Sequence, residues 1–94
     1  MSNIEYLEQL IRGRLEGQRQ RVGELFADES VFLQLQAMAK SSDWYHFEPK
    51  TYDGQYLVRR GSGYEVYEQD RGVKSNLRKF STLAEAAVEL FNSR

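Results

Sequence analysis

The side chains that could do acid–base chemistry in this sequence begin with its single histidine. His46 stands two positions before Glu48, so both side chains would project from one face if this segment is a strand. A histidine oriented by a carboxylate can act as a general base when it reaches the proton that it moves. Such a pair in an aromatic segment is far more often structural, so an enzyme that uses His46 and Glu48 ranks third among our functional hypotheses.

Other kinds of catalysis lack the residues that they need. The sequence contains no cysteine, which excludes a thiolate nucleophile, a disulfide framework and a cysteine metal site. One histidine without cysteine leaves too few nitrogen and sulfur ligands for a zinc site. We therefore expect no catalytic, cofactor-binding or metal-binding residues, and no hydrolase or nuclease activity.

Two further motifs suggest ligands but have simpler explanations. The segment Gly61-Ser62-Gly63 is glycine-rich like a phosphate-binding loop, yet such a loop opens a helix and this one joins two expected strands. We interpret it as a hairpin turn. A basic run near the N-terminus could contact an acidic partner, but neighbouring glutamates favour a solvated helix face. Its members are Arg12, Arg14, Arg19 and Arg21.

Length, composition and charge limit the class of protein. A chain of 94 residues supports one modest core, so residues 1–94 are expected to form a single domain. The 40% of hydrophobic and 29% of charged residues are typical of a soluble globular protein. A net charge of −1 argues against a dedicated nucleic-acid binder, which carries a basic excess. The sequence shows no signal peptide or membrane span, so we expect no membrane association and a cytoplasmic location.

The sequence predicts a sheet that would position the residues named above. With the two-residue period of a strand, Tyr56 and Val58 would point to one side and Gln55, Leu57 and Arg59 to the other. Tyr64 and Val66 repeat this pattern against Glu65 and Tyr67. Glycines predict a hairpin turn at 61–63 and a three-residue turn at 70–72, because both turns need a positive φ. Residues 73–80 are expected to form the third strand.

Helices are expected before and after this sheet. Residues 2–5 and 82–85 each match a capping box, which marks the start of a helix. The first helix is expected to end near Gly17, and the last carries an apolar stripe that would pack across the sheet. Residues 18–40 favour two helices with a break at 28–30, although one long helix with a polar patch fits almost as well.

The segment Trp44-Tyr45-His46-Phe47 is short and aromatic, and Pro49 follows it. We interpret it as a short strand or an edge segment that the proline ends. The predicted fold class is therefore α+β, with N-terminal helices, a three- or four-stranded antiparallel sheet and a C-terminal helix packed on the sheet. The predicted core contains Leu7, Ile11, Leu25, Val58, Val66, Leu83, Leu90 and Phe91.

Tyrosines and carboxylates alternate around the central hairpin, and there we expect a protein-binding surface. Buried rings would supply affinity and carboxylates would speed encounter with a basic cleft, with Trp44 and Tyr67 as aromatic anchors. A well-solvated sheet face explains the pattern equally well. The expected partner-binding residues are Trp44, Tyr64, Glu65, Tyr67, Glu68 and Asp70.

The run from Gly63 to Lys74, followed by Leu77, Phe80, Glu85 and Ala86, resembles small bacterial immunity proteins of polymorphic toxin and contact-dependent growth inhibition systems. The resemblance covers the last third of the chain. It implies a tyrosine-bearing strand, an acidic-Arg-Gly turn, another strand and a helix. It also implies a non-catalytic cytosolic inhibitor that binds one cognate toxin domain and blocks its active site.

A small regulatory adaptor or nucleic-acid-associated protein is the alternative. The order of one helix, three strands and one helix is similar to double-stranded RNA-binding domains, but those place lysines at the start of the last helix, where this chain has Thr82-Leu83-Ala84-Glu85. A toxin gene directly upstream would favour the immunity protein. The basic face that the alternative would use comprises Arg59, Arg60, Arg71, Lys74, Arg78 and Lys79.

Overall fold

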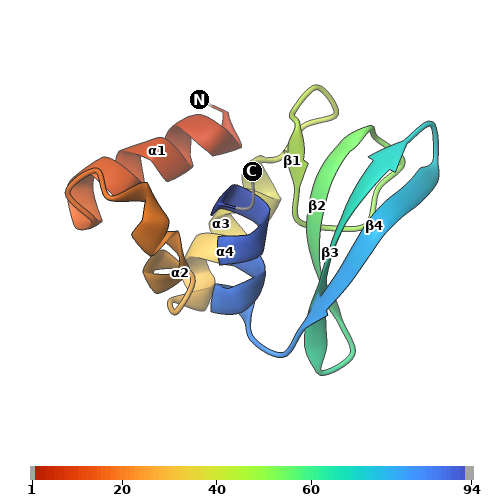
Figure 1. The fold of residues 1–94 in the computed structure, drawn as a ribbon. Helices are drawn as coiled ribbons and strands as arrows, with labels where there is room; N and C mark the ends of the chain where they lie inside the picture. Colours follow the sequence, from red (N-terminus) through yellow and green to blue (C-terminus); the bar gives the residue numbers. More distant parts are fainter. Residues whose placement is uncertain (1, 93–94) are drawn as a thin grey trace.

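A four-stranded sheet with helices packed on one of its faces makes up the fold (Figure 1). The computed structural model describes residues 2–92. It has helices before and after the sheet, so the predicted α+β class is confirmed. The helical elements are α1 (Asn3–Arg14), the 3₁₀ turn η1 (Arg19–Arg21), α2 (Val22–Leu25), α3 (Glu29–Met38) and α4 (Leu83–Asn92).

Local hydrogen bonds explain where the helices begin. At α1, the Ser2 hydroxyl accepts from the Glu5 amide at 3.2 Å while the Glu5 carboxylate accepts from the Ser2 amide at 2.9 Å, as the capping box predicts. At α4, the Thr82 hydroxyl accepts from the Glu85 amide at 3.2 Å and donates to the Glu85 carboxylate at 2.8 Å. The Glu85 carboxylate at α4 therefore accepts from the Thr82 hydroxyl, whereas the Glu5 carboxylate at α1 accepts from a backbone amide.

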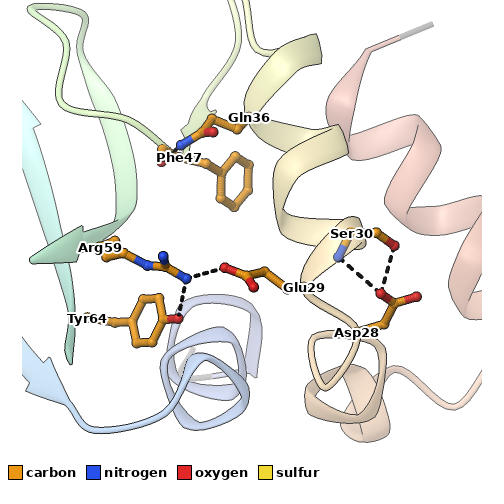
Figure 2. A network of polar contacts seen from close by, with 7 residues as sticks. All are labelled: Asp28, Glu29, Ser30, Gln36, Phe47, Arg59 and Tyr64. Atoms are coloured by element: carbon orange, nitrogen blue, oxygen red, sulfur yellow. Dashed lines mark hydrogen bonds and ion pairs between the residues drawn. The ribbon is translucent and has the colours of Figure 1, made fainter. Parts of the chain in front are cut away.

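The expected break between the second and third helices is confirmed. Asp28 lies outside α3 in an extended conformation, and its carboxylate accepts from the amide of Ser30 at 3.0 Å and from its hydroxyl at 2.7 Å (Figure 2). An aspartate in this position satisfies a free amide of the first helical turn and starts a new helix. Residues 18–40 therefore form separate helices.

The sheet contains β1 (Tyr45–His46), β2 (Gly54–Arg60), β3 (Gly63–Asp70) and β4 (Val73–Phe80), in that order across the sheet. The expectation of a wholly antiparallel sheet is wrong at one edge, because β1 runs parallel to β2. Segment 47–53 carries the chain back to the start of β2 instead of turning it tightly. So short a parallel connection suffices because β1 has only two residues.

The two hairpin turns use positive φ angles. Gly61 has a φ of 61° in the turn between β2 and β3, as expected for that glycine. The next turn holds two residues rather than the expected three, because Asp70 still pairs with Val73. Both of its residues are left-handed, Arg71 with a φ of 52° and Gly72 with a φ of 80°. The Asp53 carboxylate accepts a hydrogen bond from the Arg71 amide at 2.8 Å and holds this turn.

The main core lies between the helices and the inner face of the sheet, where Leu57 and Val66 project. Phe91 of α4 is central to it, with ring centroids 6.0 Å from Phe26, 5.1 Å from Tyr45 and 6.5 Å from Phe47. All eight predicted core residues are buried. Val58, however, lies in a second cluster, with Tyr56 and Tyr67, rather than beneath the helices.

Polar contacts also join α3 to the sheet. Arg59 of β2 binds the Glu29 carboxylate at the start of α3, and its guanidinium donates to the Tyr64 hydroxyl at 3.2 Å (Figure 2). Further along α3, the Gln36 side-chain amide donates to the Phe47 carbonyl at 3.1 Å. These bonds fix the helix against β2 and against the segment that follows β1.

Candidate functional site

Three stacked rings cross the outer face of the sheet, the face directed away from the helices. The His46 ring centroid lies 5.0 Å from that of Tyr56, which lies 5.0 Å from that of Tyr67 at an interplanar angle of 6°. The Lys74 ammonium of β4 sits 4.7 Å from the centroid of the Tyr67 ring, in cation–π geometry. The stack therefore runs through all four strands and ends at a cation.

Segment 48–53 covers part of this stack. The Tyr52 ring packs against His46 with centroids 5.4 Å apart, and its carbonyl accepts from the Tyr56 hydroxyl at 2.7 Å. The Gln69 side-chain amide donates to the carbonyls of Lys50 at 2.8 Å and Tyr52 at 3.0 Å. The outer face of the sheet is consequently a second small core, in which Tyr56 and Tyr67 have no exposed surface.

The burial of Tyr67 bears on its expected role as an anchor. Its ring is 0% exposed, and burial raises the pKa of its phenol. A partner could reach this ring only after the side chains over it had moved. Tyr67 therefore belongs to the fold, while Trp44, the other expected anchor, is 55% exposed.

The remaining residues of the expected protein-binding surface point in different directions. Tyr64 faces α3, with its ring edge-on to Phe32 at 6.2 Å. Glu68 accepts from the Gln55 side-chain amide at 2.9 Å, while Glu65 pairs with Arg60 at 3.3 Å across the hairpin. Asp70 is exposed beside the turn that follows it, and Trp44 lies next to the opposite edge of the sheet. The six residues do not form one continuous face.

His46 and Glu48 are not arranged as a histidine–carboxylate pair. The His46 ring is 1% exposed, and burial lowers its pKa below the usual 6.5, opposed by the nearby carbonyls of Asp43 and Asp53 and the Asp43 carboxylate. Glu48 lies at the surface with its carboxylate 3.8 Å from the Lys50 ammonium. In residues 2–92, no three histidine, aspartate or glutamate side chains are grouped closely enough to hold a metal ion.

The arginines considered above are largely paired with carboxylates. Near the N-terminus, Arg14 lies 3.9 Å from Asp28, Arg19 contacts Glu8, and Arg21 binds Glu24 at 2.7 Å. On the sheet, Arg59, Arg60 and Arg78 pair with Glu29, Glu65 and Glu89. The pairs of Arg14, Arg19, Arg21 and Arg59 are solvated and contribute little stability. All of these pairs reduce the positive charge that a nucleic acid would meet. The structure thus lends no support to the basic face.

An accessible apolar surface lies elsewhere, on α4. Two shallow grooves of about 390 and 440 Å³ adjoin each other, and Ala84 and Val88 line both. Val88 is 41% exposed. The first groove is completed by Phe80, Glu85 and Glu89, and the second by Gln20, Arg21, Gly23, Glu24 and Ala27.

A close approach of two helices builds this surface, which we call the α4 groove. A Cβ added at Gly23 of α2 would lie 2.8 Å from Val88 Cγ2 and 3.2 Å from the Ala84 carbonyl oxygen. Glycine therefore lets α2 close against α4 and brings α2, α4 and the end of β4 to one apolar strip. On the helical period, Ala84 and Val88 flank the apolar stripe of α4, which is a signal in the sequence. Gly23 is distant in the chain and has no such signal.

Three glutamates border the α4 groove. The Glu89 carboxylate binds Arg78 at 3.0 Å, and that of Glu24 binds Arg21 at 2.7 Å. The Glu85 carboxylate is held by the hydroxyls of Ser81 at 3.2 Å and Thr82 at 2.8 Å. Because hydroxyls leave its charge in place, Glu85 makes this border acidic.

No protein-family model, curated protein or solved structure matches this chain. Among the described residues, no helix is both long enough and apolar enough to span a bilayer.

Proposed function

We propose that this chain is a non-enzymatic immunity protein of the cytoplasm, which binds a cognate bacterial toxin domain through the α4 groove and neutralises it. The observation that carries the proposal is the exposed apolar strip around Val88 with glutamates at its border. The resemblance of residues 63–86 to immunity proteins supports the choice of partner, since Glu85 and Ala86 of α4 belong to that resemblance.

The chemistry of the groove selects the partner. An apolar floor takes up an aliphatic or aromatic side chain, and burial of such a side chain supplies most of the affinity. Glu85, whose charge is not balanced by an arginine of residues 2–92, favours a basic residue beside it. Toxins that cut nucleic acid commonly carry positive clefts for phosphate. We therefore assign to the groove a basic segment of the toxin with one apolar side chain.

Preformed geometry suits this role. The main core holds the inner stripe of α4, with Ala86 and Ala87 fully buried and Leu90 5% exposed. The capping bonds at Thr82 and Glu85 fix the first turn of the helix. A rigid helix face binds with little loss of conformational entropy. Trp44 and Asp70 are exposed elsewhere and form the second place to look for contacts.

The test is co-expression with the toxin domain encoded directly beside the gene. We expect the chain to restore growth and to co-elute with that domain as a stable complex. Absence of a neighbouring toxin gene, or failure to form a complex with it, would contradict the proposal and favour an adaptor.

A catalytically inactive toxin variant serves as the matched control. Since inhibition by binding needs no turnover of the toxin, this variant should form the same complex. A chain that protects cells by destroying the toxin or its product would instead restore growth without lasting association.

A further inference from the structure

A polar pocket of about 240 Å³ lies between the end of α3 and the segment that covers the outer face. From this geometry we propose that the pocket binds a small oxyanion, and that His46, Lys40 and Lys50 supply its donors. The pocket is separate from the α4 groove, with which it shares no residue. Its lining comprises Gln36, Ala37, Ala39, Lys40, Ser41, His46, Phe47, Glu48, Lys50 and Tyr52.

The first observation is a buried polar atom without a partner. Nε2 of His46 is buried and makes no hydrogen bond of ordinary geometry within residues 2–92, although the carbonyls of Asp43 and Asp53 lie near the ring and the ring lines the pocket. A buried donor or acceptor left unpaired is destabilising, so such an atom calls for a ligand or an ordered water. In the tautomer protonated at Nε2, the imidazole would donate to an anionic oxygen.

The second observation is the charge of the lining. Lys40 and Lys50 bring two ammonium groups, while Glu48 is the one carboxylate and is already 3.8 Å from Lys50. Asp43 is not part of the lining; its carboxylate accepts from the Lys40 amide at 2.7 Å and keeps its negative charge near the His46 ring. The lining therefore has a net positive charge, and Ser41 adds a hydroxyl to it.

The size of the pocket limits the class of ligand that it can bind. Sites for drug-sized molecules have volumes of about 300–1,000 Å³, which is more than this pocket offers. Hydrogen-bond donors outnumber carboxylates on its walls, so a small oxyanion fits better than a neutral apolar molecule or a metal cation. Inorganic phosphate and a short dicarboxylate such as succinate share the chemistry that the pocket would recognise.

The single histidine makes the test direct, because every imidazole signal in an NMR spectrum of this protein comes from His46. The protein would be titrated separately with sodium phosphate, sodium succinate and sodium chloride while the imidazole ¹⁵N resonances are followed at constant pH. We expect a saturable shift with phosphate or succinate but not with chloride. Which of the two saturates first identifies the class of oxyanion.

Two variants separate this site from general charge effects. Lys40→Gln combined with Lys50→Gln changes surface side chains and should weaken binding about tenfold or more, with the fold intact by circular dichroism. Lys79→Gln, on the exposed strand β4 and outside the pocket lining, should leave binding unchanged. Shifts that chloride reproduces, or equal affinities for the parent and the double variant, would overturn the proposal.

Discussion

Gly54 allows β1 and β2 to lie close together because it has no side chain. Its φ is 143°, and an added Cβ would lie 2.3 Å from the Trp44 carbonyl oxygen. That carbonyl accepts from the Gln55 amide at 2.7 Å, so a displacement would break a bond of the β1–β2 contact. In the sequence, Asp53-Gly54 is typical of a turn, but it does not reveal this close approach.

Gly54→Ala should lower the free energy of unfolding by about 1–3 kcal/mol, through backbone strain and overpacking. Gly13→Ala is the matched control. Gly13 lies within α1, where a Cβ would meet nothing within 4 Å, so alanine there should stabilise the protein by about 0.5–1 kcal/mol. Urea unfolding of both variants measures the difference, and a Gly54→Ala protein as stable as the parent would contradict the described contact.

His46 makes stability depend on pH in a definite direction. Burial lowers its pKa below 6.5 in the folded protein, so in mildly acid solution His46 is protonated to a greater extent in the unfolded chain than in the folded one. The free energy of unfolding should therefore be constant above about pH 6.5 and decrease between there and about pH 5. The lowered pKa values of Glu5, Glu24 and Asp28 act only below that window.

The measurement is urea unfolding across this window in a buffer without phosphate or carboxylate, since an anion beside His46 would oppose the shift. His46→Gln, which cannot titrate, should remove the dependence. A parent protein whose stability is flat from pH 7 to about pH 5 would show that the imidazole becomes protonated in the folded state as readily as in the unfolded one.

Among the elements, α4 has one face that is buried in the core and one that is exposed. Leu90 is 5% exposed and faces the core, whereas Val88 is 41% exposed and faces the groove. Leu90→Ala should cost about 2–5 kcal/mol, because it leaves a cavity. Val88→Ala should change stability by less than about 0.5 kcal/mol. Denaturation midpoints of the two variants measure this contrast, and equal midpoints would mean that α4 is not packed as described.

Elements with a strong local signal could be predicted from the sequence. The capping residues fix the starts of α1 and α4, and alternation fixes β2 and β3, because these signals act within a few residues. The direction of β1 could not be predicted, since it depends on how segment 47–53 crosses the sheet. The two-residue turn was missed because Arg71 takes a left-handed conformation that residue type assigns to glycine.

At the scale of the whole molecule, the central strands β2 and β3 have buried side chains on both faces of the sheet, whereas β4 is largely exposed. The sequence showed that Tyr56 and Val58 oppose Leu57, but not that Tyr67, Lys74 and a loop would cover them. The α4 groove also depends on contacts between distant segments, since Gly23 meets Ala84 and Val88 only after folding. Surfaces built from distant segments leave no periodic pattern in the sequence. The alternating tyrosines and carboxylates therefore led us to expect the protein-binding surface at the hairpin.

Binding kinetics with the toxin domain encoded beside the gene test the proposed binding of a basic toxin surface at α4. Val88→Lys places a cation on the floor of the groove, and Leu77→Lys makes the same change at a residue of β4 that is 47% exposed. We expect Val88→Lys to weaken binding at least about tenfold, or about 1.4 kcal/mol, and Leu77→Lys to leave it unchanged. Full affinity in the Val88→Lys variant would contradict binding of the toxin at the α4 groove.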